Sequence, residues 1–131
     1  MPPFVDDAAR YPNELRLIRI LRDAGWWYPQ HAPTRASSCA FSDTTKQNSC
    51  LVLNLLERVH FEIIATTYPG ARLSMITAGQ ARETGYLVCD DPSDFLPGHV
   101  VVCPPQATEK KDYVRMAKRL AALSVIYTPI L

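Results

Sequence analysis

Two residues suited to nucleophilic chemistry, Cys50 and His99, stand 49 positions apart. A cysteine attacks as its thiolate, and a histidine is the usual base that takes the thiol proton. Cys50 opens an apolar run that predicts a helix from about residue 49 to about residue 65, and the free N–H groups and dipole of a helix start lower a thiol pKa. His99 follows Gly98 at the start of an expected strand. The pair therefore predicts a thiol nucleophile with an imidazole base.

Cys50 has two other interpretations, a core cysteine and a metal ligand. The chain has four cysteines, and none forms C-x-x-C or stands at zinc-finger spacing from a histidine. Scattered cysteines in a reducing cell are mostly small hydrophobic residues of the core. Cys89 and Cys103 fit that description, whereas Cys39 is a rival nucleophile without a helix terminus. Position alone favours a core role for Cys50, and the addition of His99 favours a nucleophile.

The other two histidines are less suitable bases. His60 lies ten residues beyond Cys50 on the same predicted helix, which separates them by about 15 Å along its axis. His31 lies in an irregular loop. Several acidic residues can orient the catalytic imidazole, namely Asp90, Asp91, Asp94 and Asp112. Of these, Asp91 is the assigned orienting residue, and Gln47 is the assigned oxyanion donor beside the backbone N–H of the cysteine. None of these acids follows the histidine on a strand, so a dyad is expected rather than a triad.

The remaining pattern predicts a single α+β domain. Apolar spacing and stop signals predict helices over 13–24, 49–65 and 108–123, and β-branched runs predict strands over 71–78, 85–90 and 99–104. The stretch 73–82 fits a short helix equally well. Residues 1–40 are expected to form a helix and an irregular lead-in. Residues 41–131 are expected to form a compact core, in which a helical part carrying the cysteine packs on a short antiparallel sheet carrying the histidine.

Composition excludes some classes of function. The chain has 131 residues, a hydrophobic fraction of 47%, a charged fraction of 21% and a net charge of +1. Such a balance gives no electrostatic ground for binding nucleic acid or an anionic membrane. No apolar run is long enough for a bilayer span, and the N-terminus has no signal-peptide pattern. Neither a cofactor nor a metal is expected.

The stretch NSCLVLNLLE resembles the cysteine box of papain-like peptidases. The step from it to GHVVV, the strand pair, one more helix and the 32 residues after the histidine resemble the self-cleaving leader proteases of RNA viruses. The potyviral helper-component proteinase and the hypovirus leader proteases are the most similar families. Two features depart from their pattern. Ser49 and Leu51 flank the cysteine in place of aromatic residues, and the chain ends in Leu131 although the family usually cleaves after glycine.

The resemblance implies a viral cysteine endopeptidase that releases itself by one cleavage in cis at its own C-terminus. Cys50 would be the nucleophile and His99 the base. The apolar tail would stay in the cleft after cleavage, with Thr128, Pro129, Ile130 and Leu131 in the substrate subsites. The implied substrate is the protein's own polyprotein junction, and the implied location is the cytoplasm of the host cell.

Two alternatives remain open at this point. The first is a papain-like hydrolase that acts in trans. The second is a non-enzymatic module that binds a host protein, for example a silencing suppressor, with Trp26, Trp27 and Tyr28 as anchors and the cysteines as core.

Overall fold

The computed structural model describes residues 4–28, 35–91, 96 and 98–129. These residues form a six-stranded antiparallel sheet in the order β6-β7-β4-β1-β5-β8, together with a separate two-stranded ribbon, β2-β3. The strands are β1 (Arg16–Leu21), β2 (Trp27–Tyr28), β3 (Arg35–Ala36), β4 (Asn48–Val52), β5 (Arg72–Thr77), β6 (Leu87–Asp90), β7 (His99–Cys103) and β8 (Val125–Tyr127). The α-helices are α1 (Arg58–Thr67), α2 (Ala78–Glu83) and α3 (Lys110–Leu123), and the 3₁₀ helices are η1 (Ala24–Trp26), η2 (Ser38–Phe41) and η3 (Leu53–Leu55). The predicted mixed fold with an antiparallel sheet is confirmed.

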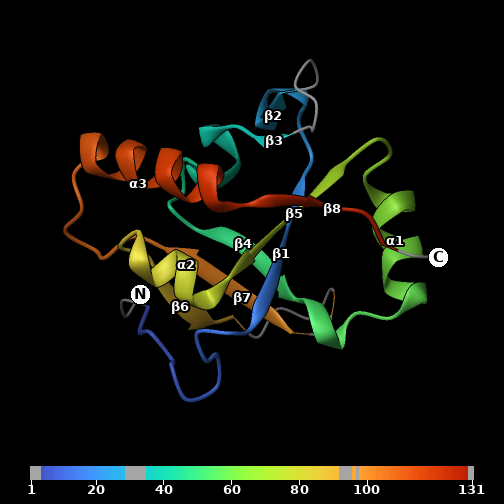
Figure 1. The fold of residues 1–131 in the computed structure, drawn as a ribbon, viewed down its shortest axis with the longest axis horizontal. Coiled ribbons are helices and arrows are strands. Elements are labelled where there is room, and N and C mark those ends of the chain that lie inside the picture. Colours follow the sequence, from blue (N-terminus) through green and yellow to red (C-terminus); the bar gives the residue numbers. More distant parts are fainter. Residues whose placement is uncertain (1–3, 29–34, 92–95, 97, 130–131) are drawn as a thin grey trace.

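The predicted helix over 13–24 is wrong, because this segment contains β1 in the interior of the sheet (Figure 1). Leu17 and Leu21 are buried in one core cluster and Ile18 in another. A strand that is buried on both faces carries apolar residues without a period of two, and its spacing can imitate that of a helix. The 1–40 segment therefore supplies a central strand of the sheet.

The predicted helix over 49–65 is wrong in its first half. Cys50 lies in the middle of β4, and α1 begins only at Arg58. The start of α1 is fixed by a capping box, in which the Nδ1 atom of His60 accepts a hydrogen bond of 2.8 Å from the backbone N–H of Glu57. β4, like β1, is buried on both faces. Its apolar residues therefore do not alternate with polar ones, and the sequence pattern does not show where the strand ends and the helix begins.

The second half of the chain follows the prediction more closely. β5, β6, β7 and α3 lie where strands and a helix are expected, and β6 and β7 form the predicted antiparallel hairpin. The ambiguous stretch 73–82 divides at Thr77. The strand β5 ends there, and α2 begins with a capping box between Thr77 and Gln80.

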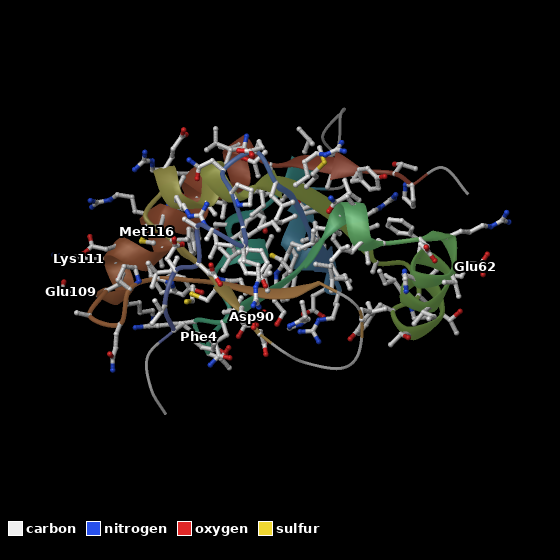
Figure 2. The ribbon with its side chains drawn as sticks, turned by 90° about the horizontal axis from the view of Figure 1, so that it is seen from below. Phe4, Glu62, Asp90, Glu109, Lys111 and Met116 are labelled. Carbon is white, nitrogen blue, oxygen red and sulfur yellow. The ribbon has the colours of Figure 1, made fainter. Side chains whose placement is uncertain are left out.

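The helices cover the two faces of the sheet unequally. One face packs Cys50, Val52 and Val100 against Tyr113 and Leu120 of α3. The other face carries a smaller cluster under α1 and leaves polar side chains beside it. Figure 2 shows Glu62 of α1 at one end of the molecule, and Glu109 and Lys111 at the opposite end with α3.

The outer edge of β6 is protected by the N-terminal segment. The backbone N–H of Asp7 donates to the carbonyl oxygen of Val88 at 2.9 Å, and the Asp6 carboxylate accepts from the N–H of Val88 at 2.8 Å. Arg82 pairs with the same carboxylate at 3.0 Å. These contacts occupy edge groups that would otherwise be free to pair with another chain. No helix in the described part of the chain is long and apolar enough to cross a membrane.

Candidate functional site

The structure places Cys50 and His99 on adjacent strands but on opposite faces of the sheet. In the β4–β7 register, Cys50 lies opposite Val100 and Leu51 lies opposite His99. Directly opposed residues share a face, and successive residues along a strand alternate between faces. The thiol and the imidazole are therefore separated by the sheet, and the predicted dyad is not formed.

The environment of Cys50 is that of a core residue. It is only 1% exposed, within the cluster under α3. Burial raises the pKa of its thiol to about 11, although the charge of Arg19 partly opposes this shift. A helix start would have lowered the pKa, but no helix begins at this position. The thiol is thus held neutral, as expected for a small hydrophobic side chain.

His99 instead lines a polar cavity of about 300 Å³ on the face of the sheet that the large core leaves open. The cavity lies where β1 and β4 separate, since these strands pair only at Leu17 and Ile18 of β1. Its lining residues are Arg19, Ile20, Arg22, Asp43, Gln47, Ser49, Leu51, Tyr68, Leu96 and His99. It is called the Arg19 cavity below. Two of its members, Gln47 and His99, belong to the predicted site.

Asp91, assigned from the sequence to orient the imidazole, lies beside His99. Its Oδ2 atom is 3.1 Å from the Nδ1 atom of His99, and its backbone N–H donates to the carbonyl oxygen of His99 at 3.3 Å. The Oδ2–Nδ1 contact is close, but it is not a hydrogen bond. The Nδ1 atom has no hydrogen-bond partner among the described residues. The His99 side chain is 15% exposed, and its Nδ1 atom is buried.

Arg19 is the most constrained charged residue of the cavity. It is 4% exposed, and its guanidinium donates to the carbonyl oxygens of Ala40 (Nε, 2.9 Å) and Ser49 (Nη1, 2.9 Å). The third nitrogen, Nη2, is buried and makes no hydrogen bond to a described residue, and the nearest carboxylate oxygen, Oδ2 of Asp43, is 3.9 Å away. Burial lowers the pKa of the guanidinium, although the nearby Cys50 thiol and the Asp43 carboxylate in part oppose this. The group stays protonated nonetheless.

Asp43 and Arg22 lie with Arg19 among the cavity's charged groups. Asp43 closes a turn by accepting hydrogen bonds from the N–H and hydroxyl of Thr45, at 2.9 and 2.7 Å. Partial burial raises the pKa of its carboxyl group. The hydrogen bonds from Thr45 and the charges of the two arginines together lower this pKa by more than burial raises it, so it lies below its ordinary value. The exposed Arg22 guanidinium lies over the rings of Trp26 and Tyr68, 5.6 and 5.7 Å from their centroids.

The described part of the C-terminal tail, up to Pro129, does not line this cavity. β8 pairs with β5 at the sheet edge, and β5, β1 and β4 separate it from β7. Thr128 and Pro129 line another cavity of about 210 Å³ against α1 and β5, which shares only Tyr68 with the Arg19 cavity among their lining residues. Ile130 and Leu131, the other tail residues of the predicted site, lie outside the described residues. The apolar tail instead completes the sheet, and Tyr127 stacks on Phe61 with 6.1 Å between ring centroids.

Sequence reasoning missed most residues of the cavity, among them Ser49 and Arg19. Ser49 was overlooked because the neighbouring Cys50 was placed on a helix, whereas strand alternation turns Ser49 toward His99 and Cys50 away from it. Arg19 stands inside the run LRLIRIL, and a cation within a buried apolar strand must find partners or a ligand. That signal was available in the sequence.

A comparison with family models, curated proteins and solved structures finds no match. Function must therefore be argued from the site itself. Among the described residues, no group of three or more His, Cys, Asp or Glu side chains is arranged to hold a metal ion.

Proposed function

We propose that the Arg19 cavity binds a small organic anion, a carboxylate or a phosphate. The observation that carries the proposal is the buried Nη2 atom of Arg19, a residue that lines the cavity. This atom makes no hydrogen bond to a described residue, the Asp43 carboxylate is 3.9 Å from it, and the centre of the Trp26 ring is 4.8 Å from the guanidinium carbon. A buried polar group without a partner is costly, and a charged one more so. An anion at this atom would supply the missing acceptor, and a guanidinium binds planar oxyanions especially well.

The rest of the lining supports an organic ligand rather than a bare ion. Ile20, Leu51, Leu96 and Tyr68 contribute apolar surface, while Ser49, Gln47 and His99 contribute hydrogen-bonding groups. Ligand sites commonly combine an apolar wall with a few polar groups, in cavities of about 300 Å³ or more. Arg22 adds positive charge and Asp43 adds negative charge to the lining.

Thermal unfolding in the presence of benzoate or phenyl phosphate tests the proposal. A ligand at about 10 mM with a dissociation constant of about 1 mM should stabilise the protein by about 1.4 kcal/mol. Arg19→Lys keeps the positive charge but loses the planar guanidinium and its paired N–H donors, so it should weaken anion binding at least about tenfold. Arg22→Gln should weaken it less, because Arg22 is exposed at the edge of the cavity.

The matched control is Arg115→Lys, since the Arg115 side chain is 73% exposed on α3, away from the cavity. It should bind both anions as the wild type does. If neither benzoate nor phenyl phosphate stabilises the protein, the proposal is refuted. Equal weakening by Arg19→Lys and Arg115→Lys would show a nonspecific charge effect and refute it as well.

The self-cleaving, papain-like thiol protease stays a prediction from the sequence resemblance, together with its polyprotein junction, its host partner and its location in the host cytoplasm. The cavity does not support it, because the Cys50 thiol is buried on the other face of the sheet. A chain extended beyond residue 131 tests it separately. Cleavage in the wild type that is lost in both Cys50→Ala and His99→Ala would restore the protease hypothesis.

A further inference from the structure

We propose that Ser49 is a nucleophile for small carboxylic esters, with His99 as its base and Asp91 as a positioning residue. The inference rests on the proposed function, because the carboxylate product of such a reaction is an anion of the kind that the Arg19 cavity would bind. It goes further by assigning a reaction to the cavity and a substrate class to the reaction.

The strand register brings the three side chains to one face. Asp91 continues the β6 strand opposite His99, and His99 lies opposite Leu51 of β4. Ser49 is two residues before Leu51, so it is the diagonal neighbour of His99 on the same face. Diagonal neighbours have Cβ atoms within about 7 Å, a span that a histidine side chain can bridge. Ser49 and His99 also line the same cavity.

The hydrogen-bonding state of the side chains suits the assigned roles. Asp91 lies at the Nδ1 edge of the His99 ring, with 3.1 Å between Oδ2 and Nδ1, although the two atoms do not form a hydrogen bond in this structure. In the proposed reaction the imidazole proton is on Nδ1, facing this carboxylate, and Nε2 is left to accept the serine proton. Neither Nε2 of His99 nor the hydroxyl of Ser49 makes a hydrogen bond to a residue that the structure describes. Both groups are therefore available to each other and to a ligand.

Arg19 is placed to stabilise the charge that develops during the attack. Its Nη1 atom donates to the carbonyl oxygen of Ser49 at 2.9 Å, so the guanidinium lies against the backbone of the nucleophile. Arg19 and Ser49 both line the cavity, and Nη2 of the same guanidinium makes no hydrogen bond to a described residue. A fixed donor beside the reacting carbonyl stabilises the oxyanion of a tetrahedral intermediate.

The reaction proceeds in two balanced steps. The Ser49 oxygen forms a bond to the ester carbonyl carbon while its proton moves to Nε2 of His99, and the bond from that carbon to the alcohol oxygen then breaks as the alcohol takes the proton. Water next attacks the acyl-serine, gives its proton to His99, and releases the carboxylic acid while Ser49 regains its proton. The sum is ester plus water giving acid plus alcohol, with no oxidant or reductant.

Labelling of the wild-type chain is the first test. Diisopropyl fluorophosphate should transfer its diisopropylphosphoryl group to Ser49 stoichiometrically with loss of fluoride, as read by peptide mass spectrometry, and benzoate should protect it. Labelling spread over several serines, or none on Ser49, would overturn the assignment. This experiment needs no variant and so does not depend on the folding of one.

Hydrolysis of p-nitrophenyl acetate is the second test. Ser49→Ala should lower kcat/KM at least about a hundredfold while benzoate binding is kept, and the control Ser42→Ala should leave both unchanged. Asp91→Asn should lower kcat with KM unchanged, because Asp91 acts through His99, and Asp91→Glu should restore part of kcat. Turnover that survives Ser49→Ala, or turnover of p-nitrophenyl phosphate but not of the acetate, would overturn the inference.

The two proposals fail in different ways. Benzoate binding without esterase turnover or Ser49 labelling would remove this inference and leave the proposed function intact. If neither benzoate nor phenyl phosphate binds, both proposals are removed.

Discussion

The reactivity of Cys50 distinguishes a core thiol from an activated nucleophile. Burial raises the pKa of this thiol from its ordinary value of 9.0 to about 11. At pH 7 the thiolate fraction then falls from about 1 in 100 to about 1 in 10,000. Because the thiolate is the reacting form, Cys50 should react at least about a hundredfold more slowly with iodoacetamide than a thiol of ordinary pKa. Access requires opening of the core strand β4, which slows the reaction further.

Time-resolved alkylation with peptide mass spectrometry measures all four cysteines in one sample. The exposed Cys39 is the internal reference, and Cys89 and Cys103 are buried like Cys50. In the folded protein only Cys39 should react promptly, and in urea all four should react at similar rates. A Cys50 rate within about threefold of that of Cys39 in the folded protein would refute the placement of its thiol and revive the catalytic dyad.

Three further predictions concern the stability of the fold. Arg19→Met should lower the free energy of unfolding by about 2–5 kcal/mol in urea titrations, because it leaves buried carbonyl oxygens, including that of Ser49, without donors; a loss below about 1 kcal/mol would contradict the role of Arg19 in joining β1 to β4. Gly98→Ala should destabilise by about 1–3 kcal/mol, because Gly98 has φ +68° and an added Cβ would lie 3.0 Å from Cβ of Val52; a melting temperature unchanged from wild type would count against this turn. Burial raises the pKa of Tyr86 above its ordinary value of 10.0, so the folded state keeps a proton that the unfolded state loses, and the stability it contributes is complete below pH 10 and declines as pH rises above it. Tyr86→Phe should therefore show a shallower loss of stability between pH 9 and 11 than wild type, and parallel curves would contradict the assignment.

The parts of the fold that the sequence predicted are those with local signals. The β6–β7 hairpin is marked by β-branched strands on either side of a turn-rich segment, and α3 by an amphipathic period. β1 and β4 lack such signals because tertiary burial on both faces, rather than local propensity, makes them strands. Their partners lie far away in the sequence, at 72–77 and 99–103, and no local pattern identifies such pairings.

The prediction of the site failed for the same reason. If a helix began here, the thiol of residue 50 would lie at the positive end of its dipole. In the strand, the side chain of residue 50 points into the core, and the side chain of residue 49 points to the opposite face, which carries His99. Gln47 and His99 line the cavity and Asp91 lies beside His99, and all three belong to local features, the hairpin and the loop before β4. The position of Arg19 depends on where β1 and β4 separate, which only the assembled sheet determines.

The most direct test of anion binding at Arg19 is an NMR titration of the ¹⁵N-labelled protein with benzoate. The account predicts saturable shifts of the Arg19 Nε–H signal and of the Ser49 and His99 backbone amides, with the amide of Arg115 unmoved. Saturable shifts confined to other parts of the chain, or no saturable shift at Arg19, would contradict it.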